Sequence, residues 1–362
     1  MKTVVHDRRL AALLASTALL TEANAQTSQL VYSQNFNSAA IDTTGTGLND
    51  GSNIVTFTHP NFTARVFDSA TQWGALTSGQ EWKALFMTSM TTGIVSDLYM
   101  PVKNTGQSVS SFSANFSLLI NYINRTTEPM ANGFSMNFGK FNDTSSAYGS
   151  EFGMYSAGDG KTGNVLTLAF DTYTYDTPSI ELRYNGSIIA TASQVPLWNT
   201  QSPAPKAAFL PVNFSYDSNG VDVTYNGTPI FSNVAVAGFT PGVNNSFAMA
   251  ARTGAAYENL FVDDIAINTT VAPFTLSGGA GSWTTAGNWT IGTAPTTNNN
   301  WIVMAGAGGN SNNNAVTAME GLVFGSAASG SYVLSGNAFT SGADGIVNNS
   351  SSAQTVSSNL TL

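Results

Sequence analysis

The stretch VLTLAFDTYTYDTPSIELRYNG, residues 165–186, decides the fold class. Two runs in it, 165–173 and 179–185, alternate apolar and polar residues, and a short polar segment with a proline separates them. Alternation with a period of two is typical of strands whose faces meet different surroundings. The stretch therefore predicts two neighbouring strands. Asp171 and Asp176 lie between them, either as ligands of a site or as ordinary acids at a strand end and a turn.

The same alternation recurs along the chain between residues 30 and 268. The further runs are 112–123, 133–139, 212–217, 221–226, 246–252 and 259–268. Asn219-Gly220 and Asn226-Gly227 are hairpin turn signals that join three successive strands. Many short strands without helices between them predict an all-β fold, an antiparallel sandwich of two packed sheets.

The N-terminus has the order of a secretory signal peptide. Basic residues precede an apolar run at 10–20, and the small residues Ala23 and Ala25 precede a candidate cleavage site before Gln26. The apolar run is shorter than the roughly 20 residues that cross a bilayer. We therefore expect residues 1–25 to be removed, the protein to be secreted or held on a bacterial outer surface, and no transmembrane span.

Composition excludes several classes of function. The chain has no cysteine, two histidines and a net charge of −9, and only 9% of its residues are charged. Thiolate metal sites and cysteine nucleophiles are excluded, and an acidic chain repels nucleic acid and anionic lipid. Only His59 follows the N-terminal segment, which excludes an HExxH zinc site and leaves one histidine for any catalytic triad.

The composition of the sequence changes near residue 271. From there the chain is rich in Gly, Asn and Ser, with isolated large apolar residues in strand-like surroundings. These residues include Trp283, Trp289, Phe324, Tyr332 and Leu334. A disordered linker is one interpretation, and a β-solenoid of short stacked strands fits the recurring aromatics better. We therefore expect domains at 26–270 and 271–362, the second continuing beyond its final strand-like LTL.

The second region resembles the start of an autotransporter-associated β-strand repeat. The resemblance is carried by GSWTTAGNW (281–289), Pro295, GLVF (321–324), YVLSG (332–336) and GIVNNSSSAQTVSSNLTL (345–362). It implies a passenger stalk displayed on a bacterial outer surface.

The first region resembles the concanavalin A-like superfamily, the jelly roll of legume-type lectins and laminin-G-like modules. The resemblance is carried by ANGFSMNFG (131–139), by residues 165–186, by YNGTPIFSNVAVAGFTP (225–241) and by FAMAARTGAAYENLFVDDIAI (247–267). It implies a jelly-roll sandwich with a ligand site at one end of the concave sheet.

The resemblance also implies site residues. Asp171, the carbonyl of Tyr173 and Asp176 match calcium ligands, whereas Ala169 and Ser179 replace a lectin glutamate and histidine. The transition-metal half of a lectin site is therefore missing, and we expect weak binding of calcium.

The sugar-contacting aspartate of the lectin motif is Asn132 here, followed by Gly133. Asn132 can still hydrogen-bond a hydroxyl, and Tyr173 or Tyr175 offers a ring for the apolar face of a sugar. The partner implied is an extracellular glycan. The sequence leaves the oligomeric state open.

Other candidate residues have simpler interpretations. Glu151 and Glu181 do not form the acid signature of jelly-roll glycosidases, so we expect no enzyme. Alternation turns one of Asp263 and Asp264 inward, where Arg252 or backbone amides would pair with it. Three functions remain: a glycan-binding module on a stalk, a structural or adhesive surface protein without a small ligand, and a jelly-roll glycoside hydrolase.

Overall fold

A computed structural model describes most of the chain. The described residues are 28–37, 55–56, 64–72, 80–100, 109–121, 130, 132–139, 147–150, 153–156, 165–174, 177–200, 204–241, 245–271, 273–276, 281–290, 294–295 and 300–361. The proposed signal peptide lies outside them.

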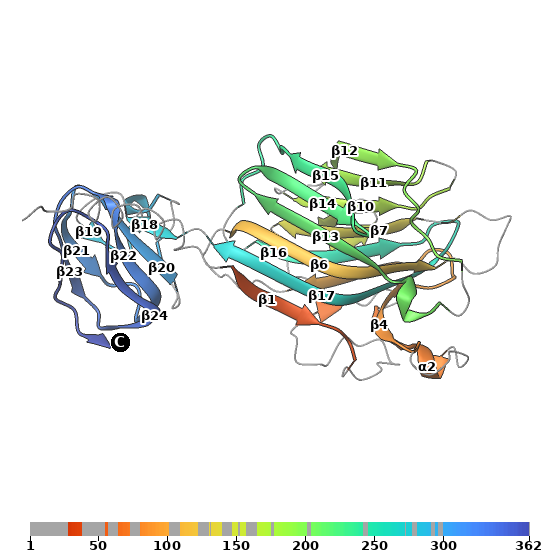
Figure 1. Ribbon diagram of the computed structural model, residues 1–362, viewed down its shortest axis with the longest axis horizontal. Helices are drawn as coiled ribbons and strands as arrows, with labels where there is room; N and C mark the ends of the chain where they lie inside the picture. Colours follow the sequence, from red (N-terminus) through yellow and green to blue (C-terminus); the bar gives the residue numbers. More distant parts are fainter. Residues whose placement is uncertain are drawn as a thin grey trace, which may run out of the picture. The chain divides into compact units, whose positions relative to one another are not determined.

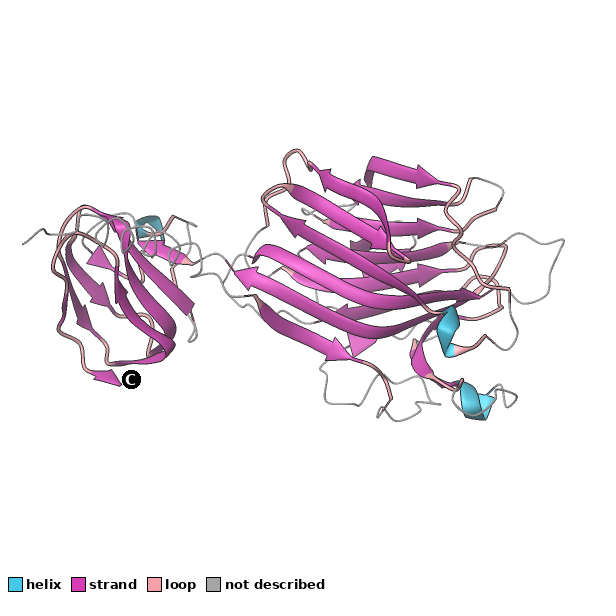
Figure 2. Cartoon of the chain, viewed as in Figure 1, coloured by secondary structure: helices cyan, strands magenta, loops and turns pink. Residues whose placement is uncertain are grey.

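The described chain is nearly all β, as the sequence predicted (Figure 2). Its helical elements are α2 (Ser69–Gln72), η1 (Lys206–Ala208) and η2 (Ala286–Asn288). No helix in the described ranges is long and apolar enough to cross a membrane. The chain divides into a larger unit, Ser28–Lys103 with Val109–Thr269, and a smaller unit that contains Thr270–Leu362.

The larger unit contains an eight-stranded sheet in the order β15-β14-β13-β6-β17-β4-β3, with β1 also paired to β17 (Figure 1). Its strands are β1 (Gln29–Gln34), β3 (Arg65–Asp68), β4 (Lys83–Thr88), β6 (Val109–Asn121), β13 (Leu210–Asp217), β14 (Gly220–Tyr225), β15 (Thr228–Val234) and β17 (Asn259–Val271).

A seven-stranded sheet stacks on it, in the order β12-β11-β10-β7-β16-β5-β2. Its strands are β2 (Val55–Thr56), β5 (Val95–Met100), β7 (Gly133–Gly139), β10 (Leu166–Asp171), β11 (Ser179–Tyr184), β12 (Ser187–Ser193) and β16 (Ser246–Arg252). Residues 165–186 therefore form β10, β11 and the segment between them, paired antiparallel with Phe170 opposite Ile180.

Aromatic side chains from both sheets meet in the core between them. Phe112 on β6 lies 4.6 Å from Phe138 on β7, and Phe116 lies 5.7 Å from Phe134, measured between ring centroids. All four are nearly inaccessible to solvent. Because strand side chains alternate, Ser135 and Asn137 point to the opposite face of the seven-stranded sheet.

That opposite face is also buried, which the sequence did not suggest. Small and polar side chains line it, and Ser135, Asn137, Ala169, Ala248 and Ala250 are all 0% exposed. A hairpin of β8 (Ala147–Ser150) and β9 (Gly153–Ser156) lies against β5, β7, β10 and β16. The small side chains allow its backbone to approach closely, so the middle of this face is not an open groove.

One of the two predicted Asn-Gly turns, Asn226-Gly227, forms as the sequence predicted. Asn226 and Gly227 have φ values of 51° and 73°, as do Asn185 and Gly186 at 48° and 79°, which suits two-residue hairpin loops. The other predicted turn is different, because Asp217 accepts the amide of Asn219 at 2.7 Å and Gly220 already begins β14.

A second hydrophobic cluster lies on the outer face of the eight-stranded sheet. Side chains alternate along β6, so Leu119 points to this outer cluster, whereas Phe116 and Leu118 point to the inner face between the two sheets. Trp82 packs between Phe67, 5.4 Å away, and Phe261, 5.0 Å away, and its indole N–H donates to the carbonyl of Ala204 at 2.9 Å.

The smaller unit is built from parallel strands that alternate between two sheets. One sheet contains β18 (Phe274–Leu276), β20 (Asn300–Gly306), β22 (Ala318–Ala328), β24 (Phe339–Asn348) and β26 (Leu360–Thr361). The other contains β19 (Gly281–Ser282), β21 (Gly309–Asn313), β23 (Tyr332–Gly336) and β25 (Thr355–Val356). The strands of this unit pair in parallel throughout the part of it that the structure describes.

The paired tryptophans of GSWTTAGNW lie in the core of this unit. Trp283 is 0% exposed, and its ring meets that of Trp289 edge-on at 5.5 Å. The Trp283 indole N–H donates to the hydroxyl of Ser311 at 2.7 Å, and that of Trp289 donates to the carbonyl of Trp283 at 2.9 Å. The tryptophans therefore serve packing here.

Candidate functional site

Four strand ends meet at one end of the seven-stranded sheet. β7 begins at Gly133, which pairs with Asp171 at the end of β10 on one side and with Arg252 at the end of β16 on the other. Arg252 in turn pairs with Val95 at the start of β5. The loops that leave these strands therefore lie next to one another.

Backbone hydrogen bonds extend this alignment into the loops. The amide of Asn132 donates to the carbonyl of Arg252 at 2.8 Å, and the amide of Thr172 donates to the carbonyl of Asn132 at 3.1 Å. The residues that the sequence predicted as one site, Asn132, Gly133 and Asp171, are therefore neighbours. Thr172 joins them.

Two polar atoms in this loop cluster are buried without a partner. The side-chain oxygens of Asn132 and Thr172 have no hydrogen-bond partner among the residues that the structure describes. An unsatisfied buried polar group costs about 1–3 kcal/mol. Both oxygens accept hydrogen bonds, so a group that donates, such as a water or a ligand hydroxyl, would remove that cost.

Gly254 keeps the space around Asn132 free. A Cβ built on Gly254 would lie 2.5 Å from Oδ1 of Asn132, so a side chain there would displace the carboxamide. The loop is held by Thr253, whose hydroxyl accepts the amide of Ile94 at 2.9 Å and donates to the carbonyl of Thr91 at 2.7 Å.

The acidic and aromatic part of the predicted site is described only in part. Asp171 is 8% exposed, and its carboxylate accepts the backbone amide of Tyr173 at 3.0 Å. That bond is the turn chemistry of an ordinary strand-end aspartate. Tyr175 and Asp176 lie outside the described residues.

The described donors do not by themselves fit a calcium ion. Calcium takes six to eight oxygens, and the described part of the predicted set offers the Asp171 carboxylate and the Tyr173 carbonyl. No group of three or more acidic or histidine side chains that could hold a metal occurs in the described ranges. Ser179, at the lectin histidine position, donates its hydroxyl to Glu181 at 3.3 Å.

Glu181 is engaged in an ion pair rather than held as a free acid. Its Oε2 lies 2.5 Å from Nη2 and 2.6 Å from Nε of Arg183, a two-point contact to one guanidinium. Such a contact engages one oxygen of the carboxylate with a charged donor. Glu151, the other glutamate considered for glycosidase chemistry, lies outside the described residues.

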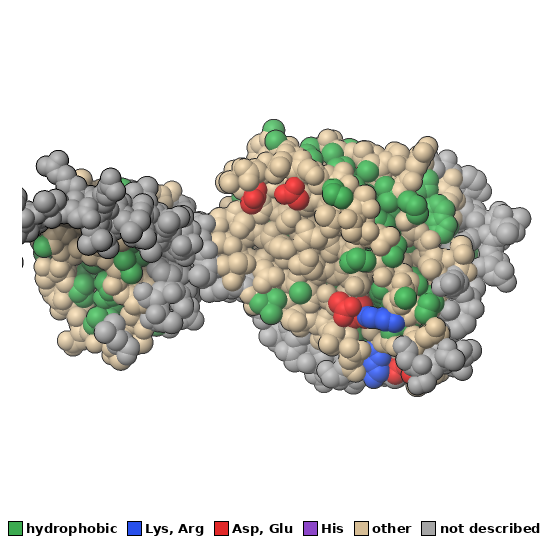
Figure 3. Space-filling view, in the orientation of Figure 1, with side chains coloured by type: hydrophobic (Ala, Val, Ile, Leu, Met, Phe, Trp, Pro, Cys, Tyr) green, Lys and Arg blue, Asp and Glu red, His purple; other side chains and the backbone are tan. Residues whose placement is uncertain are grey.

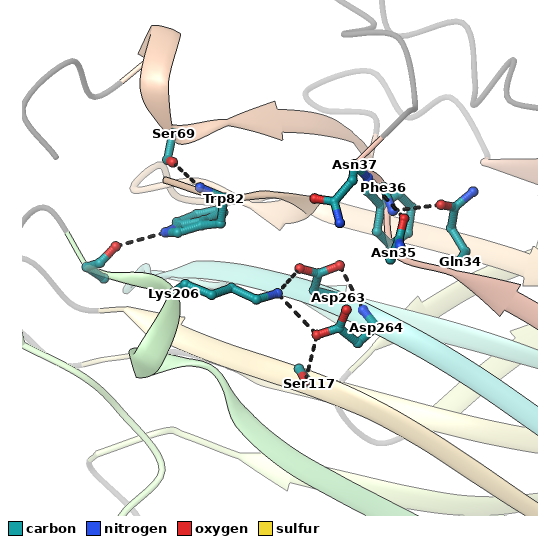
Figure 4. A network of polar contacts seen from close by, with 11 residues as sticks. Gln34, Asn35, Phe36, Asn37, Ser69, Trp82, Ser117, Lys206, Asp263 and Asp264 are labelled. Atoms are coloured by element: carbon teal, nitrogen blue, oxygen red, sulfur yellow. Dashed lines mark hydrogen bonds and ion pairs between the residues drawn. The ribbon is translucent and has the colours of Figure 1, made fainter. Parts of the chain in front are cut away.

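Asp263 and Asp264 meet a lysine, not the arginine that the sequence suggested. Asp263 is 0% exposed and contacts the ammonium of Lys206, which also lies 3.1 Å from Oδ2 of Asp264 (Figure 4). The expectation that one aspartate points inward is confirmed, and of the two partners expected for it the backbone is found, because Oδ1 of Asp263 accepts the amide of Asp264 at 2.7 Å. Lys206, not Arg252, supplies the cation. Lys206 lies in η1, which is far from β17 in the sequence and is brought next to it by folding.

Burial and pairing act in opposite directions on this pair. Burial raises the pKa of Asp263, and the hydrogen bond from Lys206 lowers it without cancelling the rise. Burial lowers the pKa of Lys206, but its hydrogen bond to Asp263 and the charge of Asp263 outweigh burial, so that pKa is raised. The lysine therefore stays charged, and its ammonium is the group that offsets the burial of the Asp263 carboxylate.

Three tryptophans between residues 73 and 198 could in principle offer a ring to a sugar, and they are placed differently from one another. Trp82 is 4% exposed and belongs to the second hydrophobic cluster. Trp198 is 39% exposed, and Trp73 lies outside the described residues. On the face shown in Figure 3, uncharged side chains and backbone cover most of the larger unit, as the low charge content predicted.

Thr172 and Gly254 are the members of the site that sequence reasoning missed. Gly254 is in the ARTG segment quoted for the family resemblance, but nothing in its sequence neighbourhood indicates contact with Asn132. Thr172 follows Asp171 directly, and its role depends on strand pairing rather than on its residue type.

Comparison with known proteins gives structural neighbours only. No protein-family model and no curated protein sequence matches this chain. Lectin I-B4 from Griffonia simplicifolia is 16% identical, with 67% of this chain and 99% of that chain covered and a TM-score of 0.41. The Bauhinia forficata lectin bound to GalNAc is 16% identical, with 68% and 99% covered and a TM-score of 0.42.

The VIP36 exoplasmic/lumenal domain in its calcium- and mannose-bound form is also similar. It is 11% identical, with 56% of this chain and 81% of that chain covered and a TM-score of 0.39. The structural neighbours are thus legume-type lectins and related domains. At this similarity they carry no argument about function, and the fold described above rests on the strand order.

Proposed function

We propose that the larger unit is a non-catalytic module that binds a glycan where β7 begins and β10 ends. The observation that carries this proposal is the pair of buried, unpartnered oxygens of Asn132 and Thr172 on the adjoining loops where β7 begins and β10 ends at Asp171. All three groups accept hydrogen bonds. A sugar presents several donor hydroxyls on one face, which suits such a set.

Disruption of this set is expected to weaken glycan binding without unfolding the protein. Asn132→Ala removes one acceptor, and Gly254→Ala pushes the carboxamide aside by its Cβ. Each lost hydrogen bond to a neutral group is worth about 0.5–1.5 kcal/mol, so we expect affinity to fall about 2- to 10-fold. The measurement is binding to a glycan array, followed by titration of the best neutral sugar.

Asn115→Ala is the matched control, because Asn115 is a partly buried asparagine on the outer face of β6. It should bind as wild type does. Equal loss in this control would mean that the effect is on folding, and wild-type binding by both site variants would contradict the proposed site. Titration with and without calcium is the second arm, and a calcium requirement would bring Asp176 into the site.

We further propose that the smaller unit is part of a β-solenoid, built from an autotransporter-associated β-strand repeat, that displays the larger unit as a stalk. The alternation of parallel strands between two sheets supports this proposal. A smaller unit that unfolds at low temperature when expressed with the larger unit would argue against a role as a rigid support.

Display outside the cell requires export, which the N-terminal charge and apolar pattern supports. We propose that the exported protein begins near Gln26. N-terminal sequencing of the secreted material checks this, and a sequence that starts at Met1 would contradict it.

A structural surface protein without a small ligand is the second candidate. The hairpin β8–β9 favours it, because it covers the middle of the seven-stranded sheet, where an open sheet face could hold a ligand. An array without any glycan signal, with the protein folded, would favour this alternative.

A further inference from the structure

The loop that follows β16 is tied to the loop that precedes β5 by backbone and side-chain hydrogen bonds. The amide of Thr253 donates to the carbonyl of Ile94 at 2.8 Å, and the amide of Gly93 donates to the carbonyl of Gly254 at 3.0 Å. The hydroxyl of Thr253 accepts the amide of Ile94 and donates to the carbonyl of Thr91. Thr253 is 1% exposed, so water competes little for these bonds. The two loops therefore form one hydrogen-bonded unit.

This unit contains both residues that hold Asn132 on the β16 side. Arg252, directly before Thr253, accepts the amide of Asn132 at 2.8 Å with its carbonyl. Gly254, directly after Thr253, passes so close that a Cβ on it would lie 2.5 Å from Oδ1 of Asn132. The position of Asn132 therefore depends on the hydroxyl that anchors Thr253.

The loop that follows β10 is anchored to the other side of Asn132 in the same way. The amide of Thr172 donates to the carbonyl of Asn132 at 3.1 Å, and the amide of Thr174 donates to the carbonyl of Met130 at 3.4 Å. The hydroxyl of Thr174 accepts the amide of Met130 at 3.1 Å. Protein hydrogen bonds therefore hold this part of the site from both sides.

The described residues at the lectin metal positions serve other contacts. Ala169 is a buried alanine, and Ser179 donates its hydroxyl to Glu181 at 3.3 Å. The Asp171 carboxylate accepts the amide of Tyr173 at 3.0 Å. Calcium takes six to eight oxygens, which this set does not by itself supply. Among the described residues, hydrogen bonds rather than metal ligands account for the position of Asn132.

We propose that Thr253 is the positioning residue of this site, and that its anchored loop gives Asn132 its binding geometry without a calcium ion. The inference rests on the glycan-binding function proposed above, because it concerns how the same site is held. A site held by buried protein hydrogen bonds is ordered before its ligand arrives, which lowers the entropy cost of binding. Affinity for a glycan should then be independent of calcium.

Amide hydrogen exchange of the full chain, followed by NMR, tests the anchoring without any glycan. In wild type we expect the amides of Ile94 and Asn132 to exchange equally slowly in EDTA and in about 10 mM calcium, a concentration above the weak extracellular affinity range. Thr253→Val keeps the shape and removes both hydroxyl bonds, so these amides should exchange at least about 5-fold faster. Thr253→Ser keeps the hydroxyl and should restore slow exchange.

Titration of the neutral sugar with the strongest array signal is the second arm. We expect the Kd of wild type to be the same in EDTA and in calcium, and that of Thr253→Val to rise at least about 5-fold. Thr167→Val is the matched control. Thr167 is 2% exposed and its hydroxyl donates to Asn137 at 2.8 Å, but it lies four residues, or about 13 Å, from Asp171 along β10. Its removal should leave the Kd unchanged.

The two arms separate the anchoring from the function. Faster exchange of the Asn132 amide in EDTA than in calcium would overturn the proposal, because a metal would then hold the loop. Exchange in Thr253→Val equal to that of wild type would overturn it as well. A protein whose exchange behaves as expected, but which binds no sugar on the array, would support the anchoring by Thr253 and contradict the glycan-binding function.

Discussion

Replacement of Trp283 by alanine is expected to lower the free energy of unfolding of the smaller unit by about 3–5 kcal/mol, the usual cost of truncating a fully buried large aromatic. Trp283 is 0% exposed and packs edge-on against Trp289. Its indole N–H also donates a hydrogen bond to the hydroxyl of Ser311, a residue that is 0% exposed. Truncation would leave both a cavity and a buried hydroxyl without this donor.

Urea unfolding of the full chain measures this loss, and Trp198→Ala is the control. Trp198 is 39% exposed, so its removal should cost less than about 1 kcal/mol. A Trp283→Ala variant as stable as the control would mean that the tryptophan pair is not the centre of this core. Trp283→Phe should restore part of the loss, because it refills the space but not the hydrogen bond.

Replacement of Lys206 by methionine is expected to destabilise the larger unit by about 2–3 kcal/mol near neutral pH. Breaking a buried ion pair by removing one partner costs about 3–5 kcal/mol, and the 40% exposure of the Lys206 side chain lets water reduce that cost. The loss arises chiefly because Asp263 remains as a buried carboxylate with fewer donors. Lys206 also lies over the ring of Phe209, at 5.0 Å.

The pH dependence of this loss has a defined sign. Burial already raises the pKa of Asp263, and removal of Lys206 raises it further. A carboxyl whose folded pKa exceeds its unfolded pKa binds more protons in the folded state, so stability falls as pH rises through that interval. The deficit of the variant should therefore shrink as the pH falls through the raised folded pKa of Asp263, and it should be smallest below the unfolded carboxyl pKa of about 4.

The second change Asp263→Asn should restore most of the stability that Lys206→Met loses, because it removes the uncompensated charge. Lys83→Met is the matched control. Lys83 lies 3.6 Å from Asp68 with both side chains partly exposed, and such surface pairs contribute about 0–1 kcal/mol. Equal losses for the two lysines, or a deficit that persists in the double variant at all pH values, would contradict this account.

The sequence by itself determined the all-β character of the chain and most strand positions. Runs such as 133–139 and 246–252 coincide with β7 and β16, since side-chain alternation is a local property of each strand. The Asn226-Gly227 turn was equally local, because its backbone conformation depends on those two residues. That Asn132 lies next to Asp171 was predicted from a family resemblance, not from the alternation of side chains.

Only the tertiary structure decided the partners of the polar residues. Lys206 meets Asp263 across 57 positions of sequence, Gly254 leaves room for Asn132, and a hairpin covers the middle of the seven-stranded sheet. These contacts depend on the register of strands that are far apart in the chain. A shift of one residue in any of those pairings would turn the side chains to the opposite face, and no local pattern specifies which distant strand becomes the neighbour.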